Sequence, residues 1–190
     1  LCHELTSVTI PDGVQYIGDR AFSPCNNLTT VTIPDSVVSL GDSAFTLTPL
    51  EMDKTNWENG ALYLGKILVA VRDDIVSDYR IKNGTKVIAD GAFSYSGVKN
   101  VTIPDSVTTI GDSAFYKCAL KSITIPETVT TIGDYAIGYG NGYHSESALK
   151  YGFEIFGVKG SAAETYAKDN DITFVDIASH THSYTSTVTN

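Results

Sequence analysis

The sequence predicts an elongated solenoid, a β-rich α/β fold in which 22–23-residue units of strand, turn and short helix wind into a right-handed superhelix. Three observations predict it. Residues 31–45 (VTIPDSVVSLGDSAF) and 101–115 (VTIPDSVTTIGDSAF) are nearly identical. Residues 80–93 keep the same spacing in a looser copy. Ile-Pro pairs recur at matching positions, with their isoleucines at Ile10, Ile33, Ile103 and Ile125.

Each of the five units is punctuated in the same way. Val31, Thr32 and Ile33 alternate apolar and polar residues, which predicts a strand with Thr32 facing outward. Pro34 ends the strand because proline has no N–H to donate to a ladder. The Gly-Asp pair that follows predicts a second turn, where the aspartate caps a short helical segment that presents Ala and Phe to the core. These aspartates are Asp19, Asp42, Asp90, Asp112 and Asp134.

An insertion separates the second unit from the third. Residues 46–79 do not fit the repeat. Within them, residues 59–72 (NGALYLGKILVAVR) read as two short strands joined by a tight turn at Gly65-Lys66. We therefore expect a hairpin that extends the solenoid, and we assign residues 1–177 to a single solenoid domain.

The C-terminal end of the array predicts a cap. Residues 153–156 read as a strand, and Ser161 to Glu164 have the spacing of a capping box at the start of a short helix. A strand over residues 172–175 follows, so residues 158–177 can seal the last apolar face. Residues 178–190 are polar, as expected of a flexible tail or the start of another module. The chain starts in the middle of a unit, so we expect the natural N-terminal cap to be missing.

The repeated pattern L-x-x-V-T-I-P-x-x-V-x-x-I-G-D-x-A-F resembles the leucine-rich repeats of the BspA-like class of bacterial cell-surface proteins. The resemblance covers residues 5–45 and 80–137, and residues 160–177 are similar to the ending of such arrays. It implies a leucine-rich-repeat solenoid that is secreted or held at the cell surface. It also implies a non-catalytic module that binds a protein or glycan on a host or neighbouring cell, as in adhesion. Ile81-Lys82 departs from the pattern because it lacks the proline.

Charge and hydropathy exclude two classes of partner. The chain has 190 residues and a net charge of −9, and its 13 Lys and Arg residues do not cluster, which argues against nucleic acid. The longest apolar run, residues 67–71, is too short to cross a bilayer. We therefore expect no membrane-spanning segment, and we expect a monomer.

Cysteine and histidine residues offer little chemistry. Cys2, Cys25 and Cys118 occupy the same phase of the repeat, so either a Cys2–Cys25 disulfide or free buried thiols would fit, and burial is the simpler explanation. An odd number of cysteines without C-x-x-C argues against zinc. His180 and His182 lack a third ligand, and His3 and His144 lie at irregular ends of the array.

Two further patterns have simple structural explanations. Residues 60–66 (GALYLGK) match the spacing of a phosphate-binding loop, but Ile67 replaces the required Ser or Thr and a strand follows in place of a helix. The row of aspartates could serve a hydrolase or bind Ca²⁺, yet aspartates at turns already accept backbone N–H groups. We expect no enzyme activity, no cofactor and no metal.

Two sets of residues are candidates for binding. The first is the outward position of successive strands, which could form a recognition face or simply reflect the preference of threonine for strands and water. Its members are Thr9, Thr32, Arg80, Thr102 and Thr124.

The second set consists of aromatic residues in the irregular segments. They could form a binding patch, but local packing of the hairpin and the cap is the simpler interpretation. They are Trp57, Tyr63, Tyr79, Tyr139 and Tyr143. Clustered exposed aromatic rings would indicate recognition, a uniformly polar surface would indicate a structural spacer, and a calcium-dependent melting temperature would indicate an ion-dependent module.

Overall fold

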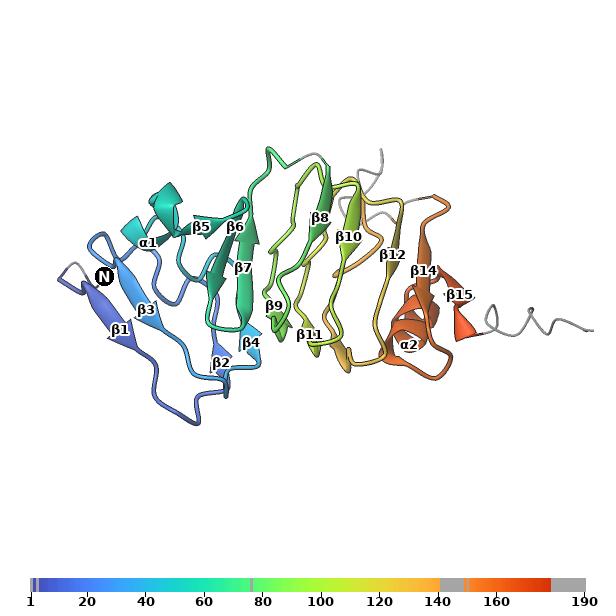
Figure 1. Ribbon diagram of the computed structural model, residues 1–190, viewed down its shortest axis with the longest axis horizontal. Helices are drawn as coiled ribbons and strands as arrows, with labels where there is room; N and C mark the ends of the chain where they lie inside the picture. Colours follow the sequence, from blue (N-terminus) through green and yellow to red (C-terminus); the bar gives the residue numbers. More distant parts are fainter. Residues whose placement is uncertain (1, 3, 76, 141–148, 150, 179–190) are drawn as a thin grey trace, which may run out of the picture.

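The computed structural model describes residues 2, 4–75, 77–140, 149 and 151–178 and shows an elongated solenoid (Figure 1). Successive turns of the chain lie side by side along the long axis, from the N-terminal units at one end to the cap at the other. The predicted leucine-rich-repeat solenoid is therefore confirmed. Among the described residues, no helix combines the length and apolar character needed to span a membrane.

The first strand of each unit forms one row along the solenoid. β1 pairs with β3, β8 pairs with β10, and β12, β14 and β15 form a three-stranded sheet, all parallel. The predicted strand–proline boundary is confirmed where a proline is present, since β1, β3, β10 and β12 each end just before the isoleucine of an Ile-Pro pair. The row consists of β1 (Ser7–Thr9), β3 (Thr30–Thr32), β8 (Asp78–Arg80), β10 (Asn100–Thr102), β12 (Ser122–Thr124), β14 (Glu154–Gly157) and β15 (Thr173–Asp176).

The second, shorter strand of each unit forms another row. β2 pairs with β4, and β9, β11 and β13 continue a six-stranded sheet in the order β13-β11-β9-β7-β6-β5. The strands of this row are β2 (Tyr16–Ile17), β4 (Ser39–Leu40), β9 (Val87–Ile88), β11 (Thr109–Ile110) and β13 (Thr131–Ile132). Main-chain bonds link each unit to the one before it: Gly111 donates to the carbonyl of Ile88 and Gly133 to that of Ile110, both at 2.9 Å.

The third segment of each unit differs from the prediction. It consists of hydrogen-bonded turns rather than a short helix. The residue after each aspartate has a positive φ, as at Ser43 (56°) and Ser113 (53°), which is incompatible with a continuing right-handed helix. The aspartates instead link neighbouring units, because Oδ1 of Asp112 accepts the N–H of Asp134 at 2.8 Å. Asp19 and Asp90 accept the equivalent amides of the next unit.

The units share one continuous apolar core. The isoleucines that follow the first strands lie in equivalent places, and Ile81 and Ile125 are almost completely buried. The phenylalanine rings of successive units stack, with centroids 5.3 Å apart for Phe22 and Phe45 and 4.7 Å apart for Phe93 and Phe115. Stacking of identical units therefore provides the burial that no single unit could achieve.

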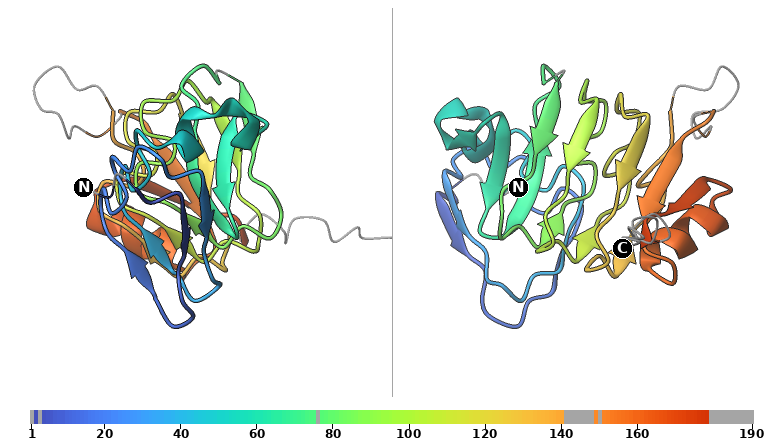
Figure 2. Two further views of the ribbon diagram at one scale, coloured as in Figure 1. Left: turned by 90° about the vertical axis from the view of Figure 1, so that its left-hand side faces the viewer. Right: turned by 45° about the vertical axis from the view of Figure 1, so that its right-hand side comes forward.

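The predicted hairpin is confirmed. One of its strands also takes a place in the second row of strands, which the sequence did not indicate. β6 (Ala61–Leu64) and β7 (Ile67–Val71) are antiparallel, and Gly65 at their turn has φ 58°. β7 also pairs in parallel with β9, so it occupies the place of a second-row strand. The preceding residues form elements that were not predicted: α1 (Pro49–Met52), the 3₁₀ turn η1 (Lys54–Asn56) and β5 (Trp57–Glu58). These lie together at one side of the solenoid (Figure 2).

The C-terminal cap combines α2 (Ala162–Asp169) with β15, as predicted. The hydroxyl of Tyr166 accepts the N–H of Ile137 at 2.9 Å and thus replaces the carbonyl of a further repeat. The predicted capping box does not form. The Glu164 carboxylate accepts the N–H of Gly160 at 2.6 Å, one residue before the expected donor, and the hydroxyl of Ser161 has no partner among the described residues.

Candidate functional site

The outward strand positions form the row that the sequence predicted. Thr9 lies opposite Thr32, and Thr102 lies opposite Arg80, with each side chain exposed. Thr124 is likewise exposed on β12. The row is interrupted, however, because the hairpin separates β3 from β8. It therefore consists of two stretches of exposed polar side chains rather than one continuous stripe.

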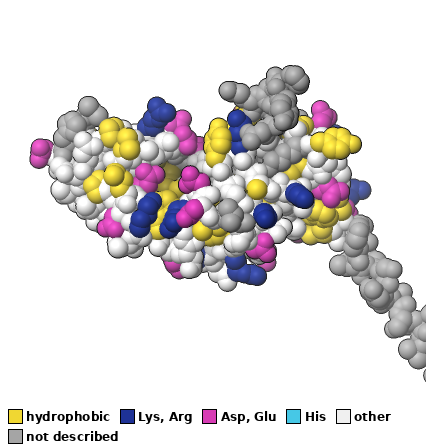
Figure 3. Space-filling view, turned by 90° about the horizontal axis from the view of Figure 1, so that it is seen from above, with side chains coloured by type: hydrophobic (Ala, Val, Ile, Leu, Met, Phe, Trp, Pro, Cys, Tyr) yellow, Lys and Arg dark blue, Asp and Glu magenta, His cyan; other side chains and the backbone are white. Residues whose placement is uncertain are grey.

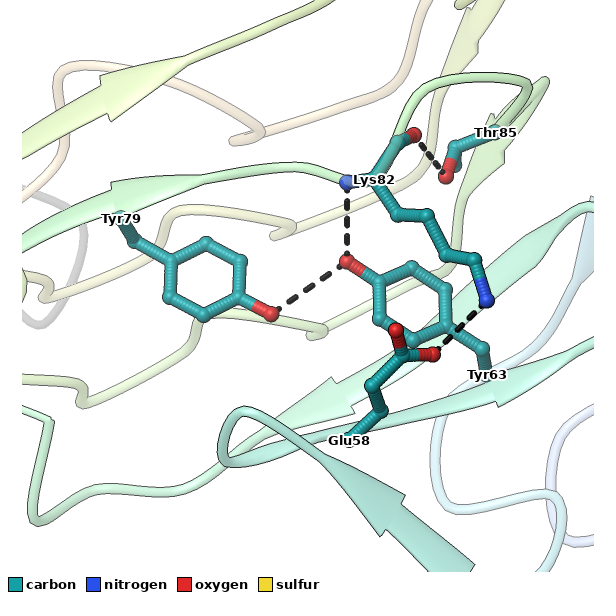
Figure 4. Close-up of polar contacts among 5 residues, drawn as sticks. All are labelled: Glu58, Tyr63, Tyr79, Lys82 and Thr85. Atoms are coloured by element: carbon teal, nitrogen blue, oxygen red, sulfur yellow. Dashed lines mark hydrogen bonds and ion pairs between the residues drawn. The ribbon is translucent and has the colours of Figure 1, made fainter.

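Polar contacts fasten the hairpin to the repeat that follows it (Figure 4). The Tyr63 and Tyr79 hydroxyl oxygens are 3.3 Å apart, and the main-chain N–H of Lys82 donates to the Tyr63 hydroxyl at 3.2 Å. The ammonium of Lys82 lies 2.7 Å from the carboxylate of Glu58 and 5.7 Å from the centre of the Tyr63 ring. The Glu58 carboxylate raises the pKa of Lys82.

Most of the aromatic residues that the sequence indicated pack locally. Tyr79 is only 7% exposed, and burial, together with the Tyr63 hydroxyl, raises its pKa. The indole N–H of Trp57 donates to the carbonyl of Glu51 at 2.7 Å. Tyr139 is buried and donates to Oδ1 of Asn170 at 2.7 Å. These rings support the hairpin and the cap, and Tyr143 lies outside the described residues.

A row of exposed tyrosines elsewhere was missed by the sequence reasoning. Tyr95 is 64% exposed and Tyr135 is 49% exposed, on the turn segments of the third and fifth units. The Tyr135 ring centroid is 5.1 Å from that of Tyr139. Tyr116 lies between them in the chain, and its ring centroid is 5.9 Å from that of Tyr95. The ammonium of Lys117 lies 5.3 Å and 5.2 Å from the Tyr95 and Tyr116 rings. We call Tyr95, Tyr116, Lys117 and Tyr135 the tyrosine row.

The sequence did contain a signal for the tyrosine row. Tyr95 and Tyr116 follow the core phenylalanine of their unit by two residues and one residue, and Tyr135 directly follows the turn aspartate. The side chains at these positions cannot share the core already filled by the phenylalanines and alanines, so a large ring there must lie at the surface.

Charged residues of both signs are spread over the surface. Figure 3 shows one face on which Lys and Arg side chains alternate with Asp and Glu, and the hydrophobic patches are small and separate. One carboxylate is unusual. Burial and, to a smaller extent, the nearby carboxylates of Asp112, Asp19 and Asp42 raise the pKa of Asp90 to about 6, although the N–H of Asp112 lowers it.

The residues considered for metal, nucleotide and disulfide chemistry have structural positions. Cys25 and Cys118 are buried and form no disulfide, and burial raises the pKa of Cys25, with the Cys2 thiol adding to the effect. Cys2 is exposed, contrary to the expectation of burial, because it lies on the outermost described turn. Gly65-Lys66 is a hairpin turn, and Lys66 forms an ion pair with Asp35.

Metal-ligating side chains do not converge in the part of the chain that the structure describes. There, no three His, Cys, Asp or Glu side chains come close enough together to hold a metal ion. His3, His144, His180 and His182 lie outside the described residues.

Sequence comparison agrees with this architecture. The model of the BspA type leucine-rich repeat region matches residues 1–66 and 73–145 in six copies. The chain belongs to the BspA-type leucine-rich-repeat family. The six copies exceed the five units counted from the sequence. The match includes residues 46–66 and 73–79, so the prediction that the whole of 46–79 lies outside the repeat was wrong. A search of curated proteins gave no match.

Several solved structures of bacterial proteins are similar to this BspA-type chain. A leucine-rich repeat protein from Eubacterium ventriosum is 22% identical with a TM-score of 0.46, over 82% of this chain and 61% of that chain. A leucine rich cell surface protein from Faecalibacterium prausnitzii is 33% identical with a TM-score of 0.33, over 80% and 39%. The pneumococcal vaccine antigen PcpA is 16% identical with a TM-score of 0.34, over 91% and 68%. The chain thus spans less than two thirds of the first two proteins.

Proposed function

We propose that this chain is a non-catalytic binding module of a secreted or cell-surface bacterial protein, and that it recognises a protein or glycan on a host or neighbouring cell. Membership of the BspA-type family supports this proposal. A similar protein from Faecalibacterium prausnitzii is described as a cell surface protein. Repeat solenoids generally use their extended surfaces for binding rather than for catalysis.

The tyrosine row is the observation that carries the proposal. Tyrosine rings are large and amphipathic, and they lose little conformational entropy on binding, so they are enriched at the energetic centres of interfaces. Tyr95 and Tyr135 expose much of their surface to water instead of packing in the core. The main chain beneath them is rigid, since the N–H of Tyr95 donates to the carbonyl of Tyr116 at 2.9 Å. Lys117 adds a cation that can pair with a carboxylate or donate to a sugar hydroxyl.

The interrupted outward row could extend the same contact. Its threonine hydroxyls can donate and accept hydrogen bonds with little loss of entropy, and the guanidinium of Arg80 can donate them. The rows lie on different segments of each unit, so a partner could use one row without the other.

The test compares binding of the fluorescently labelled chain with that of its variants, on a glycan array and on cultured epithelial cells. We expect Y95S/Y135S to reduce binding about tenfold or more, because aromatic anchors at interfaces often contribute 2 kcal/mol or more. Y151S is the matched control, since Tyr151 is also a fully exposed tyrosine but lies outside the row. If the double variant binds like the unchanged chain, the tyrosine row is not the recognition surface.

A structural spacer is the alternative. The internal packing of Trp57, Tyr79 and Tyr139 and the even mixture of charges in Figure 3 favour it. Absence of binding by the unchanged chain to every glycan and cell type tested would support the spacer over a recognition module.

A further inference from the structure

The repeat-to-repeat bonding of the second row stops at β13. In the interior of the array, the carbonyl of Thr108 accepts the N–H groups of Thr130 and Thr131, at 2.9 and 3.2 Å. The carbonyl of Ile110 accepts the N–H of Gly133. Each unit therefore presents these carbonyl acceptors toward the C-terminal end, beside the bonds exchanged within the parallel pairs of β9, β11 and β13.

At β13 no further second-row strand follows among the described residues, because β13 is the terminal strand of its sheet. Among the residues that the structure describes, no N–H takes the place of a next unit at the carbonyls of Thr130 and Ile132. Asp134 likewise lacks the following aspartate amide that its equivalents Asp90 and Asp112 receive at Oδ1. The edge of β13 thus presents the same carbonyl acceptors as an interior unit, together with the N–H of Ile132, which is equivalent to that of Ile110.

The cap leaves room beside this edge. α2 covers the neighbouring turn through the Tyr166 hydroxyl, but a groove of about 860 Å³ remains between α2 and β13. Its walls include the main chain of residues 130–134 on one side and residues from α2, such as Thr165, on the other. Volumes of this order suit a ligand of several residues.

The charge of the groove indicates which side chains a bound segment would carry. Its lining contains the carboxylates of Glu127, Asp134 and Asp169 and no lysine or arginine. An incoming segment with Lys or Arg side chains would complement these charges, and its main-chain N–H groups would complement the acceptors of the edge.

We propose that the groove between β13 and α2 is a docking site for an extended segment of a partner protein that carries Lys or Arg side chains. The segment adds to the sheet as a strand parallel to β13. It donates main-chain N–H groups to the carbonyls of Thr130 and Ile132 and to Oδ1 of Asp134, as the second strand of another repeat would do. This site is separate from the tyrosine row, so it stands whether or not that row binds.

The first experiment selects random ten-residue peptides displayed on phage against the full chain and measures the selected peptides by fluorescence anisotropy. We expect enrichment of Lys and Arg in peptides without proline at their centre. The variant E127K/D169K should weaken binding about tenfold, since it reverses two groove charges. The matched control D12K/D73K changes two exposed aspartates outside the groove and should leave binding unchanged.

The second experiment tests the main-chain bonds. Each selected peptide is made with single N-methyl groups at successive positions, which remove one donor at a time. Methylation at alternate positions should lower affinity about tenfold, and methylation at the intervening positions should have little effect. In ¹⁵N-labelled protein, the amide signals of Thr131, Ile132 and Gly133 should shift on binding.

Several outcomes would overturn the proposal. These are failure to enrich any peptide, equal affinity for the chain and E127K/D169K, or insensitivity to N-methylation at every position. Sedimentation that shows the chain pairing with a second copy of itself through this edge, with no peptide able to compete, would also overturn it. That result would assign the groove to self-association.

Discussion

The regular repeats and the hairpin insertion bury similar side chains in the same core, but different interactions hold them. Between regular units, main-chain bonds recur from one unit to the next, as from Gly133 to Ile110. The hairpin forms such main-chain bonds with the unit that follows it, where the N–H of Ala89, directly after β9, donates to the carbonyl of Leu68 in β7 at 2.9 Å. On the other side it contacts the turn after β3 through the ion pair of Lys66 with Asp35.

This difference shows how a solenoid can tolerate an irregular segment. A copy of the repeat brings its own hydrogen-bond partners, because its main chain follows the same path as its neighbour. An inserted hairpin has one strand in register, and its remaining contacts come from side chains. We expect stability to depend mainly on the shared core and the main-chain ladder, and only weakly on the exposed side-chain contacts. Four substitutions test this expectation.

The largest effect is expected from F93A. Phe93 is fully buried, stacks on Phe115 and meets the edge of the Tyr79 ring at 5.6 Å, so it joins the regular repeats to the end of the insertion. Its removal should lower the free energy of unfolding by about 3–5 kcal/mol, measured by urea denaturation. F22A removes a half-buried ring near the end of the array, and it should lower the free energy of unfolding by less than F93A does. Equal losses at both positions would contradict a core that is continuous through the insertion.

Glycine at the start of each turn gives a sharper comparison. A Cβ at Gly111 would lie 2.2 Å from Oδ1 of Asp90 and 2.7 Å from its main-chain nitrogen, whereas a Cβ at Gly18 meets nothing within 4 Å. G111A should therefore destabilise the fold by about 1–3 kcal/mol, and G18A should change stability by less than about 1 kcal/mol. Thermal unfolding of both variants checks this. Similar effects at the two glycines would mean that close stacking of units is not what requires glycine at Gly111.

Asp90 lies where the two regions meet, since its N–H donates to the carbonyl of Leu40 on the far side of the hairpin. Its pKa is raised from 3.8 to about 6 in the folded chain, so folding binds a proton and stability falls as pH rises from about 4 to about 6. D90N removes the charge and keeps an oxygen that can accept the Asp112 amide.

The variant should be more stable than the unchanged chain by about 1–2 kcal/mol at pH 7.5, after allowance for solvent screening, and the difference should shrink at pH 4. Urea denaturation at both values of pH measures it, with D12N at an exposed aspartate as control. A constant difference between pH 4 and pH 7.5 would show that the charge of Asp90 is not the cause.

The smallest effect is expected at the side-chain contact of the hairpin. Lys66 and Asp35 are both largely exposed, and the Lys66 side chain lowers the pKa of Asp35. K66A should lower the free energy of unfolding by less than about 1 kcal/mol, and the loss should be smaller in high salt. Chemical denaturation at low and high ionic strength tests this. A loss as large as that of F93A would show that side-chain contacts, rather than the shared core, hold the insertion.

The array could be predicted from the sequence because its signal is repeated. A single Val-x-Ile triplet or a single Phe does not indicate whether its side chains face the core or the solvent. Five aligned copies do, because the same positions are apolar in each copy. The amphipathic helix α2 was also predictable, since Ala163, Tyr166 and Ala167 lie on one face and are buried.

Other features depend on contacts that a single unit does not contain. Ser43 and Ser113 give no indication of their positive φ, so the sequence predicts short helical segments where the structure has turns. The pairing of β7 with β9 joins segments about 20 residues apart in the chain and cannot be derived from either alone. For the candidate site, the outward row followed from alternation. The burial of Tyr79 and Tyr139 agrees with the simpler interpretation of local packing, but their partners in the hairpin and the cap could not be derived from the sequence.

The aspartates that link one unit to the next repel one another, and this repulsion grows with the number of units in the array. Every added unit places another carboxylate on the same line, about 4.8 Å from the last, which is less than the Debye length of about 8 Å in physiological salt. Burial is the main cause of the raised pKa of Asp90, and the charges of Asp112, Asp19 and Asp42 add to it. Counter-ions in the surrounding medium should therefore favour longer arrays of this type more than shorter ones, so that ionic strength sets how many such units can be stacked at neutral pH.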